Sequence, residues 1–370
     1  MESKIALVNG HIYNGDDYFI GQALLIKGSV IHGIFPKHAI PEDYVQIDVE
    51  GANICPGLID LQIYGAGEDL FSAVLSAESI SRIDNSLLAA GCTSYLLTLA
   101  TNSLSVFKEA IAVFNSTESS VALGLHLEGP FLNSTKRGAH PAELILKASP
   151  ENIEELLHDA KDAVKMMTVA PELLDDSCLD LLLESGILLS AGHSAARYAE
   201  GIAAFDKGIQ ATTHLWNAMS AFHHRETGLS GATFRHPQAR ASIIVDGIHV
   251  DYEAVRLSKQ LLDRRLFLIT DAVAPCSTGI YQHLLNKDHF TLPDGTLSGS
   301  ALTLLKAIQN CVEHVGIALD EAIRMATLYP AALLGRSDIG QFVEGSRANI
   351  LVFKEDFSVQ NVYLDGERVF

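Results

Sequence analysis

Eight short apolar runs, nearly all followed by a polar residue and separated by helical stretches, constrain the fold more than any other feature. The runs cover residues 58–63, 94–99, 122–127, 165–170, 187–191, 210–215, 242–245 and 266–270. The helical stretches between them include residues 78–90, 103–115, 150–164, 175–184 and 253–262. This alternation predicts an α/β fold of the closed (β/α)8 type, a TIM-like barrel. A doubly wound open sheet is the alternative, and it would bind its ligand at a single crevice.

The stretch over residues 187–219 shows the repeating unit most clearly. Its first five residues are apolar enough for a strand buried on both faces, and Gly208 is placed to end the helix that follows. Two successive strands are followed by His193 and His214. Parallel strands joined by a helix bring their C-terminal ends to one edge of a sheet. We therefore interpret the two histidines as ligands of one metal ion rather than as ordinary loop residues.

Both ends of the chain differ from this pattern, because they contain short strands and turns but no helices. The strand-like runs are residues 23–26, 30–34, 45–49, 350–353 and 359–364. We predict that residues 1–53 and 336–370 pair into one small β-sandwich domain, attached to a barrel of residues 54–335. Two independent β appendages are the alternative.

Charge and cysteine usage exclude several classes of partner. The chain of 370 residues has 45 acidic and 26 basic side chains, a net charge of −19, which argues against nucleic acid or an anionic membrane as partner. The five cysteines are scattered, as in a reduced cytoplasmic protein. We also expect no signal peptide, since the first residues lack a basic segment before an apolar core, and no membrane span.

Glu128 and Asp271 each follow an apolar strand. A carboxylate with two imidazoles is a common catalytic ligand set for zinc or a similar divalent metal, so Glu128 completes the set begun by His193 and His214. Asp271, emerging beside such a cation, could take a proton from a metal-bound water and give it to a leaving group. His126 lies two residues before Glu128 on the same strand, and we leave it as a supporting or core residue.

Gln62 and Tyr64 end the first strand, where many metal-dependent barrel hydrolases carry a His-x-His pair that holds a second metal. Neither side chain is a good ligand beside carboxylate and imidazole, so the sequence predicts one metal per chain. In the basic loop after Glu128, His140 could polarise a substrate carbonyl. In a later loop Arg225 could grip a phosphate through its planar fork. A solvated surface loop is the alternative for both segments.

At these residues the chain resembles the N-acetylglucosamine-6-phosphate deacetylase family of the amidohydrolase superfamily. The matching pieces are PGLIDLQ, GLHLEGPFLN, KRGAHP, SAGHS, TTHLWNAM, RETGLSGA, DGIHV, ITDAVAP, LSGSALTL and MATLYPA. They occur in family order and cover nearly the whole chain from residue 51 to 350, and their combination is specific.

The resemblance implies a role for each matching residue. Glu128, His193 and His214 would bind the metal, and Gln62 would lie beside it. Asp271 would be general base and then general acid, and His140 would polarise the acetyl carbonyl. Substrate-binding positions would be Ala139, His140, Asn217, Ala218, Arg225, Asp246, Gly247, Ile248, His249, Leu297, Ser298 and Gly299. The phosphate would lie near Asn217, Ala218, Arg225 and His249.

The resemblance also implies a reaction, hydrolysis of N-acetyl-D-glucosamine 6-phosphate to D-glucosamine 6-phosphate and acetate, with zinc, iron or another divalent metal. Homodimers are usual in the family. The rivals are the epimeric N-acetyl-D-galactosamine 6-phosphate as substrate, a non-catalytic amidohydrolase-like binding protein, and another amidohydrolase such as a deaminase or dihydroorotase. One departure matters, because single-metal members often carry Gln-x-Asn where this chain has Gln62-Ile63-Tyr64.

Overall fold

The chain folds into two units, each formed from segments that are distant in sequence. The computed structural model describes residues 3–160 and 163–370. The first unit consists of Met1–Asp60, Asn85–Ser94 and Thr303–Phe370, and the second of Leu61–Asp84 and Tyr95–Leu302. The domain boundaries predicted above, 1–53 with 336–370 and 54–335, stay a prediction.

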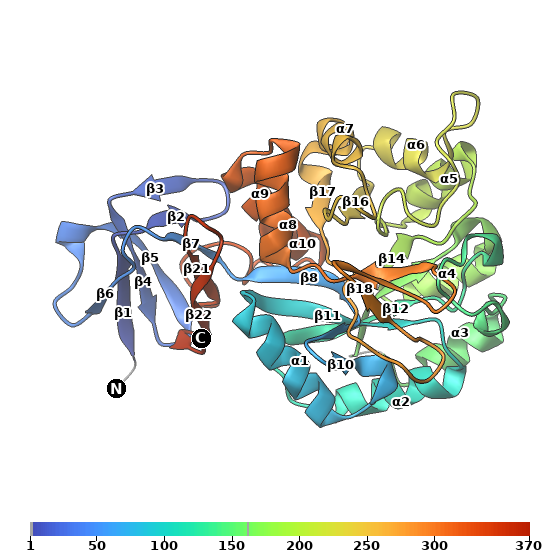
Figure 1. Cartoon of the computed structure of the whole chain (residues 1–370), viewed down its shortest axis with the longest axis horizontal. Coiled ribbons are helices and arrows are strands. Elements are labelled where there is room, and N and C mark those ends of the chain that lie inside the picture. Colours follow the sequence, from blue (N-terminus) through green and yellow to red (C-terminus); the bar gives the residue numbers. More distant parts are fainter. Residues whose placement is uncertain (1–2, 161–162) are drawn as a thin grey trace. The chain divides into compact units, whose positions relative to one another are not determined.

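An eight-stranded sheet forms the barrel, and its strands follow one another in the order β8, β11, β12, β13, β14, β15, β16, β17 (Figure 1). Their bounds are Leu58–Ile63, Cys92–Ala100, Ala122–Glu128, Val164–Val169, Leu188–Ala191, Ala211–Thr212, Arg240–Ile243 and Leu266–Leu268. From β11 to β17 every neighbouring pair is parallel. The ring closes after the last strand, because Asp271 N–H donates to the Gln62 carbonyl and Tyr64 N–H donates to the Ala272 carbonyl, both at 2.9 Å. The predicted (β/α)8 barrel is confirmed.

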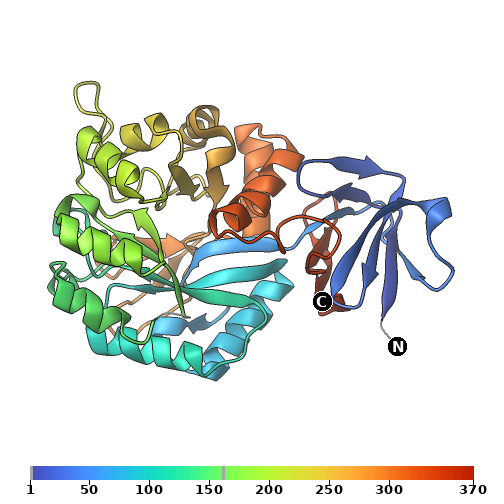
Figure 2. The ribbon, with the colours of Figure 1, turned by 180° about the vertical axis from the view of Figure 1, so that it is seen from behind.

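Helices connect the strands, and α2, α3 and α4 lie on the outer side of the sheet in both views (Figures 1 and 2). The helices are α1 (Ala77–Ala89), α2 (Leu104–Asn115), α3 (Pro150–Leu157), α4 (Asp176–Glu184), α5 (Tyr198–Lys207), α6 (Gly228–Arg235), α7 (Tyr252–Leu262), α8 (Leu304–Asn310), α9 (Leu319–Met325) and α10 (Leu328–Leu333). Local chemistry sets their ends: the Ser103 side chain caps α2, and Gly208 ends α5 with φ 122°.

One predicted helix and three predicted strands are shorter in the structure. The helix expected over residues 150–164 ends at Leu157, because Val164 already pairs with Leu125 of β12. Residues 161–162 of that predicted helix lie outside the described residues. The strands expected to reach residues 215, 245 and 270 end at Thr212, Ile243 and Leu268.

The two chain termini build a β-sandwich in the first unit. One sheet has the order β5, β4, β1, β6 and the other β23, β22, β21, β7, β2, β3. The bounds are β1 (Lys4–Val8), β4 (Gln22–Lys27), β5 (Val30–Pro36) and β6 (Val45–Asp48), then β2 (His11–Tyr13), β3 (Tyr18–Ile20), β7 (Asn53–Pro56), β21 (Ile350–Phe353), β22 (Val359–Leu364) and β23 (Glu367–Arg368). Leu24 and Ile26 share a buried core with Ile350 and Val352. The predicted sandwich is confirmed.

Short antiparallel strands complete the second unit. They are the pair β9 (Gly65–Ala66) and β10 (Asp69–Leu70), and the three-stranded sheet β18 (Leu284–Asn286), β19 (His289–Thr291) and β20 (Leu297–Ser300). No helix among the described residues is long and apolar enough to cross a membrane.

Candidate active site at the strand ends

Four of the predicted residues lie where barrel strands end. Glu128 is the last residue of β12, His193 and His214 come two residues after β14 and β15, and Asp271 comes three residues after β17. The Glu128, His193 and His214 side chains are almost completely buried. Parallel strands have placed residues that are up to 143 positions apart, from 128 to 271, beside one another.

The backbone is strained at three of these positions. His193, His214 and Asp271 have φ of 47°, 34° and 54°, a left-handed conformation that costs a non-glycine residue about 1–3 kcal/mol. Hydrogen bonds to the backbone of each residue hold this conformation. The His193 carbonyl accepts from Asn133 N–H at 2.9 Å, and His214 N–H donates to the Ser242 hydroxyl at 2.8 Å. Asp271 is held by the closure bond to Gln62. The turns at His214 and Asp271 follow β15 and β17, two of the strands that end earlier than predicted.

Three side-chain atoms converge on one point. Glu128 Oε1 lies 3.2 Å from His193 Nε2 and 3.1 Å from His214 Nε2, and the two nitrogens are 3.0 Å apart. Ligand atoms around a tetrahedral ion that holds each of them at about 2.0 Å are separated by about 3.3 Å. The spacing therefore fits one small divalent ion bound by a carboxylate and two imidazoles.

Hydrogen bonds prepare His193 to bind a cation. Its Nδ1 faces the Lys136 carbonyl at 2.9 Å, and since a carbonyl only accepts, Nδ1 carries a proton. This leaves Nε2 as the ring atom that can donate to Glu128 when the ring is charged, or bind a cation when the ring is neutral. At His214 burial by itself lowers the pKa, but the hydrogen bond to Glu128 and the charge of that carboxylate outweigh it and raise the pKa. A positive charge is thus favoured where the metal would bind.

His140 belongs to the same cluster but in a different tautomer. Its Nε2 lies 3.0 Å from Glu128 Oε2, and Glu128, His140 and His193 lie close enough together to hold a metal ion. However, Thr101 N–H donates to His140 Nδ1 at 3.3 Å, so the ring proton is on Nε2. Burial lowers the pKa of His140 to about 4, which keeps the ring neutral. In this form His140 can donate a hydrogen bond from Nε2, and its place outside the metal-ligand set stays a prediction.

Gln62 and Tyr64 connect the carboxylates. The Gln62 amide donates to Glu128 Oε1 at 2.9 Å and to Asp271 Oδ1 at 2.7 Å. The Tyr64 hydroxyl donates to Glu128 Oε2 at 2.5 Å. Burial and the nearby charges of Glu128 and Asp271 raise the pKa of Tyr64 well above its ordinary value, so the phenol stays protonated. These two residues thus hold the Glu128 carboxylate by hydrogen bonds, and the single metal ion per chain stays a prediction.

The two carboxylates have opposite pKa shifts. Burial by itself would raise the pKa of Glu128, but the charge of His193 and the hydrogen bonds to His140 and His193 outweigh it, so the pKa lies well below its usual range. Burial raises the pKa of Asp271, against the charge of His214, and the negative charge of Glu128 adds to the rise. These shifts favour the ionised form of Glu128 and the protonated form of Asp271.

His126 supports the site from inside the barrel. It is completely buried, and its Nδ1 faces the Leu61 carbonyl at 2.9 Å, so it donates there and its Nε2 accepts from the Thr168 hydroxyl at 2.8 Å. Burial lowers its pKa to about 4, which keeps it neutral. It is a core residue.

Apart from Arg225, the residues predicted to bind substrate fall into three groups. Ala139 and Ser298 line one cavity together with Glu128 and His140, and Leu297 and Gly299 flank Ser298 in β20.

The second group lies in the segment after β16, which includes Gly247 and Ile248. There Asp246 and His249 form a buried pair at 2.6 Å. Burial would raise the pKa of Asp246, but the hydrogen bond and charge of His249 lower it. Asn217 and Ala218 lie in the turn after His214, where Asn217 N–H donates to the His214 carbonyl at 2.9 Å.

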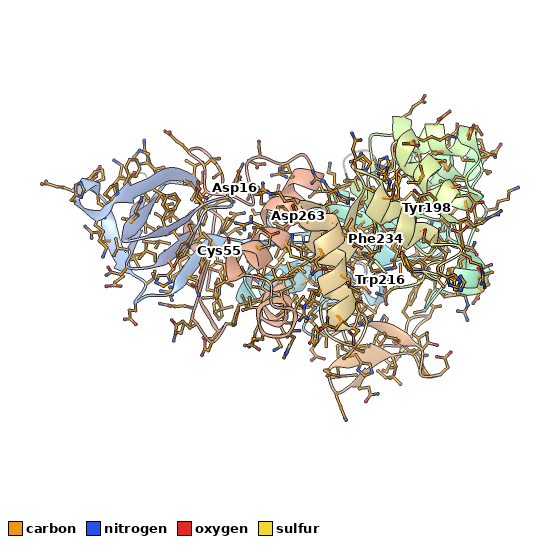
Figure 3. All side chains as sticks on the ribbon, turned by 90° about the horizontal axis from the view of Figure 1, so that it is seen from above. Asp16, Cys55, Tyr198, Trp216, Phe234 and Asp263 are labelled. Carbon is orange, nitrogen blue, oxygen red and sulfur yellow. The ribbon has the colours of Figure 1, made fainter. Side chains whose placement is uncertain are left out.

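Arg225 lies apart from this cluster, in an exposed loop. The loop leads into α6 and stands clear of its surroundings in Figure 1. Its base is anchored where Phe222 packs on Trp216 and Phe234, whose rings are 5.5 Å apart and are labelled in Figure 3. The Arg225 guanidinium lies 3.2 Å from the neighbouring His224 ring. The structure does not bring Arg225 to the metal-binding atoms.

Two supporting residues were missed in the sequence. Thr101 donates its backbone N–H to His140 and its hydroxyl to the Glu128 carbonyl at 3.1 Å, and its own carbonyl accepts from the Tyr281 hydroxyl at 2.6 Å. A Cβ on Gly129 would lie 2.2 Å from the Thr101 hydroxyl, which explains the glycine after Glu128. Thr101 was detectable as the polar residue directly after the second barrel strand, whereas Tyr281 carries no local signal.

This barrel, with a carboxylate, imidazoles and a second carboxylate at its strand ends, defines a metal-dependent hydrolase. The model of the amidohydrolase family matches residues 53–369, and that of the NagA composite domain matches residues 5–54. The chain belongs to the amidohydrolase family.

Three similar proteins indicate which kind of amidohydrolase this chain resembles. N-acetylglucosamine-6-phosphate deacetylase from Haemophilus influenzae is 34% identical, over 98% of this chain and 99% of its own length. The crystal structure of N-acetylglucosamine-6-phosphate deacetylase from Pasteurella multocida has a TM-score of 0.94 and 35% identity, and covers 99% of both chains. N-acetylgalactosamine-6-phosphate deacetylase from a Shewanella species is 32% identical over 85% of this chain and 82% of its own length.

Proposed function

We propose that this enzyme hydrolyses N-acetyl-D-glucosamine 6-phosphate to D-glucosamine 6-phosphate and acetate. The observation that carries the proposal is the convergence of Glu128 Oε1, His193 Nε2 and His214 Nε2 within 3.0–3.2 Å of one another. Gln62 ties Asp271 to the same carboxylate. Relatives that match nearly the whole chain carry the name of this activity.

Glu128, His193 and His214 would hold one divalent ion, for which we propose zinc. When bound, such an ion supplies a Lewis acid and lowers the pKa of a coordinated water towards 7. Asp271 takes the proton of the attacking water, and burial suits it to hold that proton. It then gives the proton to the amide nitrogen as the C–N bond breaks, which releases the amine and acetate.

His140 stabilises the charge that develops on the acyl oxygen. Its Nε2–H points into the cluster, and the backbone N–H of Thr101 keeps the ring in this tautomer. Because the ring is neutral and buried, it donates a hydrogen bond without adding a second positive charge beside the metal site.

The substrate is tested with a panel of three compounds: N-acetyl-D-glucosamine 6-phosphate, its galactosamine epimer and unphosphorylated N-acetylglucosamine. We expect acetate release with the highest kcat/KM for the glucosamine 6-phosphate. Faster hydrolysis of the epimer would favour the alternative substrate. The relative named for the glucosamine compound is 34% identical to this chain, and the relative named for the galactosamine compound is 32% identical. Absence of acetate from all three compounds, in protein loaded with zinc, would contradict the proposal.

We also propose a homodimer that works in the cytoplasm. Exposed apolar side chains on the second unit, among them Phe222, Leu257 and Leu261, support a subunit interface. Five free cysteines support a reducing compartment. Light scattering coupled to gel filtration tests the first point, and a mass of one chain would contradict it.

A further inference from the structure

A small cavity of about 40 Å³ adjoins the proposed reaction centre. Glu128 and His140 lie at one side of it, and Tyr64, Leu70, Ala100 and Val273 contribute apolar wall. Leu70 and Val273 belong to one buried cluster against which Tyr64 packs, so this wall is part of the packed interior. The cavity is therefore bounded on this side by packed residues of the barrel end.

Most polar groups around the cavity already have protein partners. The Tyr64 hydroxyl is bound to Glu128, the Tyr281 hydroxyl to the Thr101 carbonyl, and His283 Nδ1 lies 3.0 Å from the Ser298 hydroxyl. Burial lowers the pKa of His283 to about 4, so this ring is neutral. An apolar group can therefore enter without leaving these polar atoms unpaired.

The size of the cavity selects what can enter. A water molecule needs a cavity volume of at least about 10–15 Å³, so this cavity holds a group of two or three heavy atoms. A hexosamine phosphate cannot fit. The residues predicted for the phosphate, Arg225 and His249 among them, are absent from the described residues that line it.

The amide carbon of the substrate has three substituents, and two of them have assigned places. In the proposed mechanism its oxygen would face His140 Nε2, and its nitrogen, which carries the sugar, would face Asp271. The third substituent is the methyl group, and the cavity lies beside Glu128 and His140, which the proposed mechanism places around the amide carbon. We propose that this cavity is the acyl pocket and that Leu70 and Ala100 limit the length of the acyl chain the enzyme removes. The inference rests on the proposed function and names the acyl class of that site.

The test compares N-formyl, N-acetyl, N-propionyl and N-butyryl glucosamine 6-phosphate by release of the free amine. One methylene in a tight apolar pocket changes kcat/KM by about 10–200-fold, so the wild type should lose at least tenfold between acetyl and butyryl. Leu70→Ala enlarges the pocket and should raise the butyryl-to-acetyl ratio by about tenfold or more. Ala100→Val fills it and should lower the acetyl-to-formyl ratio by a similar factor.

Leu156→Ala is the matched control, because Leu156 is buried in α3 and does not line the cavity. It should lose stability as Leu70→Ala does and leave the acyl ratios unchanged. If Leu70→Ala fails to fold, Ala100→Val carries the test. Normal acetyl hydrolysis with unchanged ratios in the folded pocket variants overturns the acyl pocket and leaves the proposed function standing. No amine from any of the four 6-phosphates in zinc-loaded wild type overturns both.

Discussion

The strand-end cluster and the loop that carries Arg225 belong to the same unit of the molecule, yet their side chains are held in different ways. Glu128 is buried and accepts hydrogen bonds from Gln62, Tyr64 and His140. Arg225 is exposed and contacts only its neighbours in sequence among the described residues. The atoms of the cluster are thus brought together without a ligand, whereas Arg225 lies in an exposed loop apart from them.

The physical reason for this difference is where the backbone is fixed. Residues at the ends of barrel strands inherit the rigidity of the sheet, so strained turns at His193, His214 and Asp271 can be maintained. Loops outside the sheet have fewer buried contacts and adapt to ligands. Catalytic groups need sub-ångström placement, which the ends of the barrel strands provide. An anion can be recognised by a residue in a loop outside the sheet. Four predictions test this contrast.

The largest effect is expected from Asp271→Asn, which keeps the shape and removes the base. The kcat should fall by about 10²–10⁴-fold, the usual contribution of general acid–base catalysis. Metal content, measured by atomic emission, should stay near one ion per chain, because Asp271 contributes no atom to the proposed ligand set. Turnover close to that of the wild type would show that another group moves the proton.

The next prediction distinguishes His214 from His140 as the third ligand of the metal ion. His214→Ala should weaken metal binding more than the roughly 100-fold that loss of a supporting residue causes, because it removes a direct ligand. His140→Ala should retain close to one ion per chain, since its Nε2 carries a proton in this structure. Competition with a chelator measures both affinities. The reverse order would exchange the roles of the two histidines.

Arg225→Ala tests the loop directly. A charge-assisted contact contributes about 1.5–3 kcal/mol, and each 1.4 kcal/mol is about tenfold, so kcat/KM for the 6-phosphate should fall by about 10–150-fold. The unphosphorylated sugar lacks the contact and should be nearly unaffected. Arg197→Ala, at another exposed arginine, is the matched control. An equal loss on both substrates would make Arg225 structural.

The smallest effect concerns Tyr64→Phe, which keeps the ring and removes the hydrogen bond to Glu128. Partners of metal ligands typically contribute 10–100-fold to affinity or activity. We expect about tenfold weaker metal binding, near the lower limit because Gln62 and His140 still orient the carboxylate. The acyl preference should not change, since the pocket wall remains. Unaltered chelator competition would show that Tyr64 only fills space.

Much of this architecture was determined by the sequence alone. Apolar runs at regular intervals predicted the barrel and its strand order, since buried parallel strands leave a strong pattern. The polar residue after each run located Glu128, His193, His214 and Asp271, because all such residues share one edge of the sheet. The alternation at both termini likewise predicted the sandwich, which forms from the two ends of the chain.

Only the tertiary structure decided how those residues work together. The tautomer of His140 depends on the backbone of Thr101, and that of His193 on the carbonyl of Lys136, neither of which has a sequence signature. The role of Tyr64 and the cavity beside it arise from contacts between strands far apart in the chain. Sequence patterns record which face of an element is apolar, whereas hydrogen-bond direction and cavity shape depend on atoms that only the closed barrel brings together.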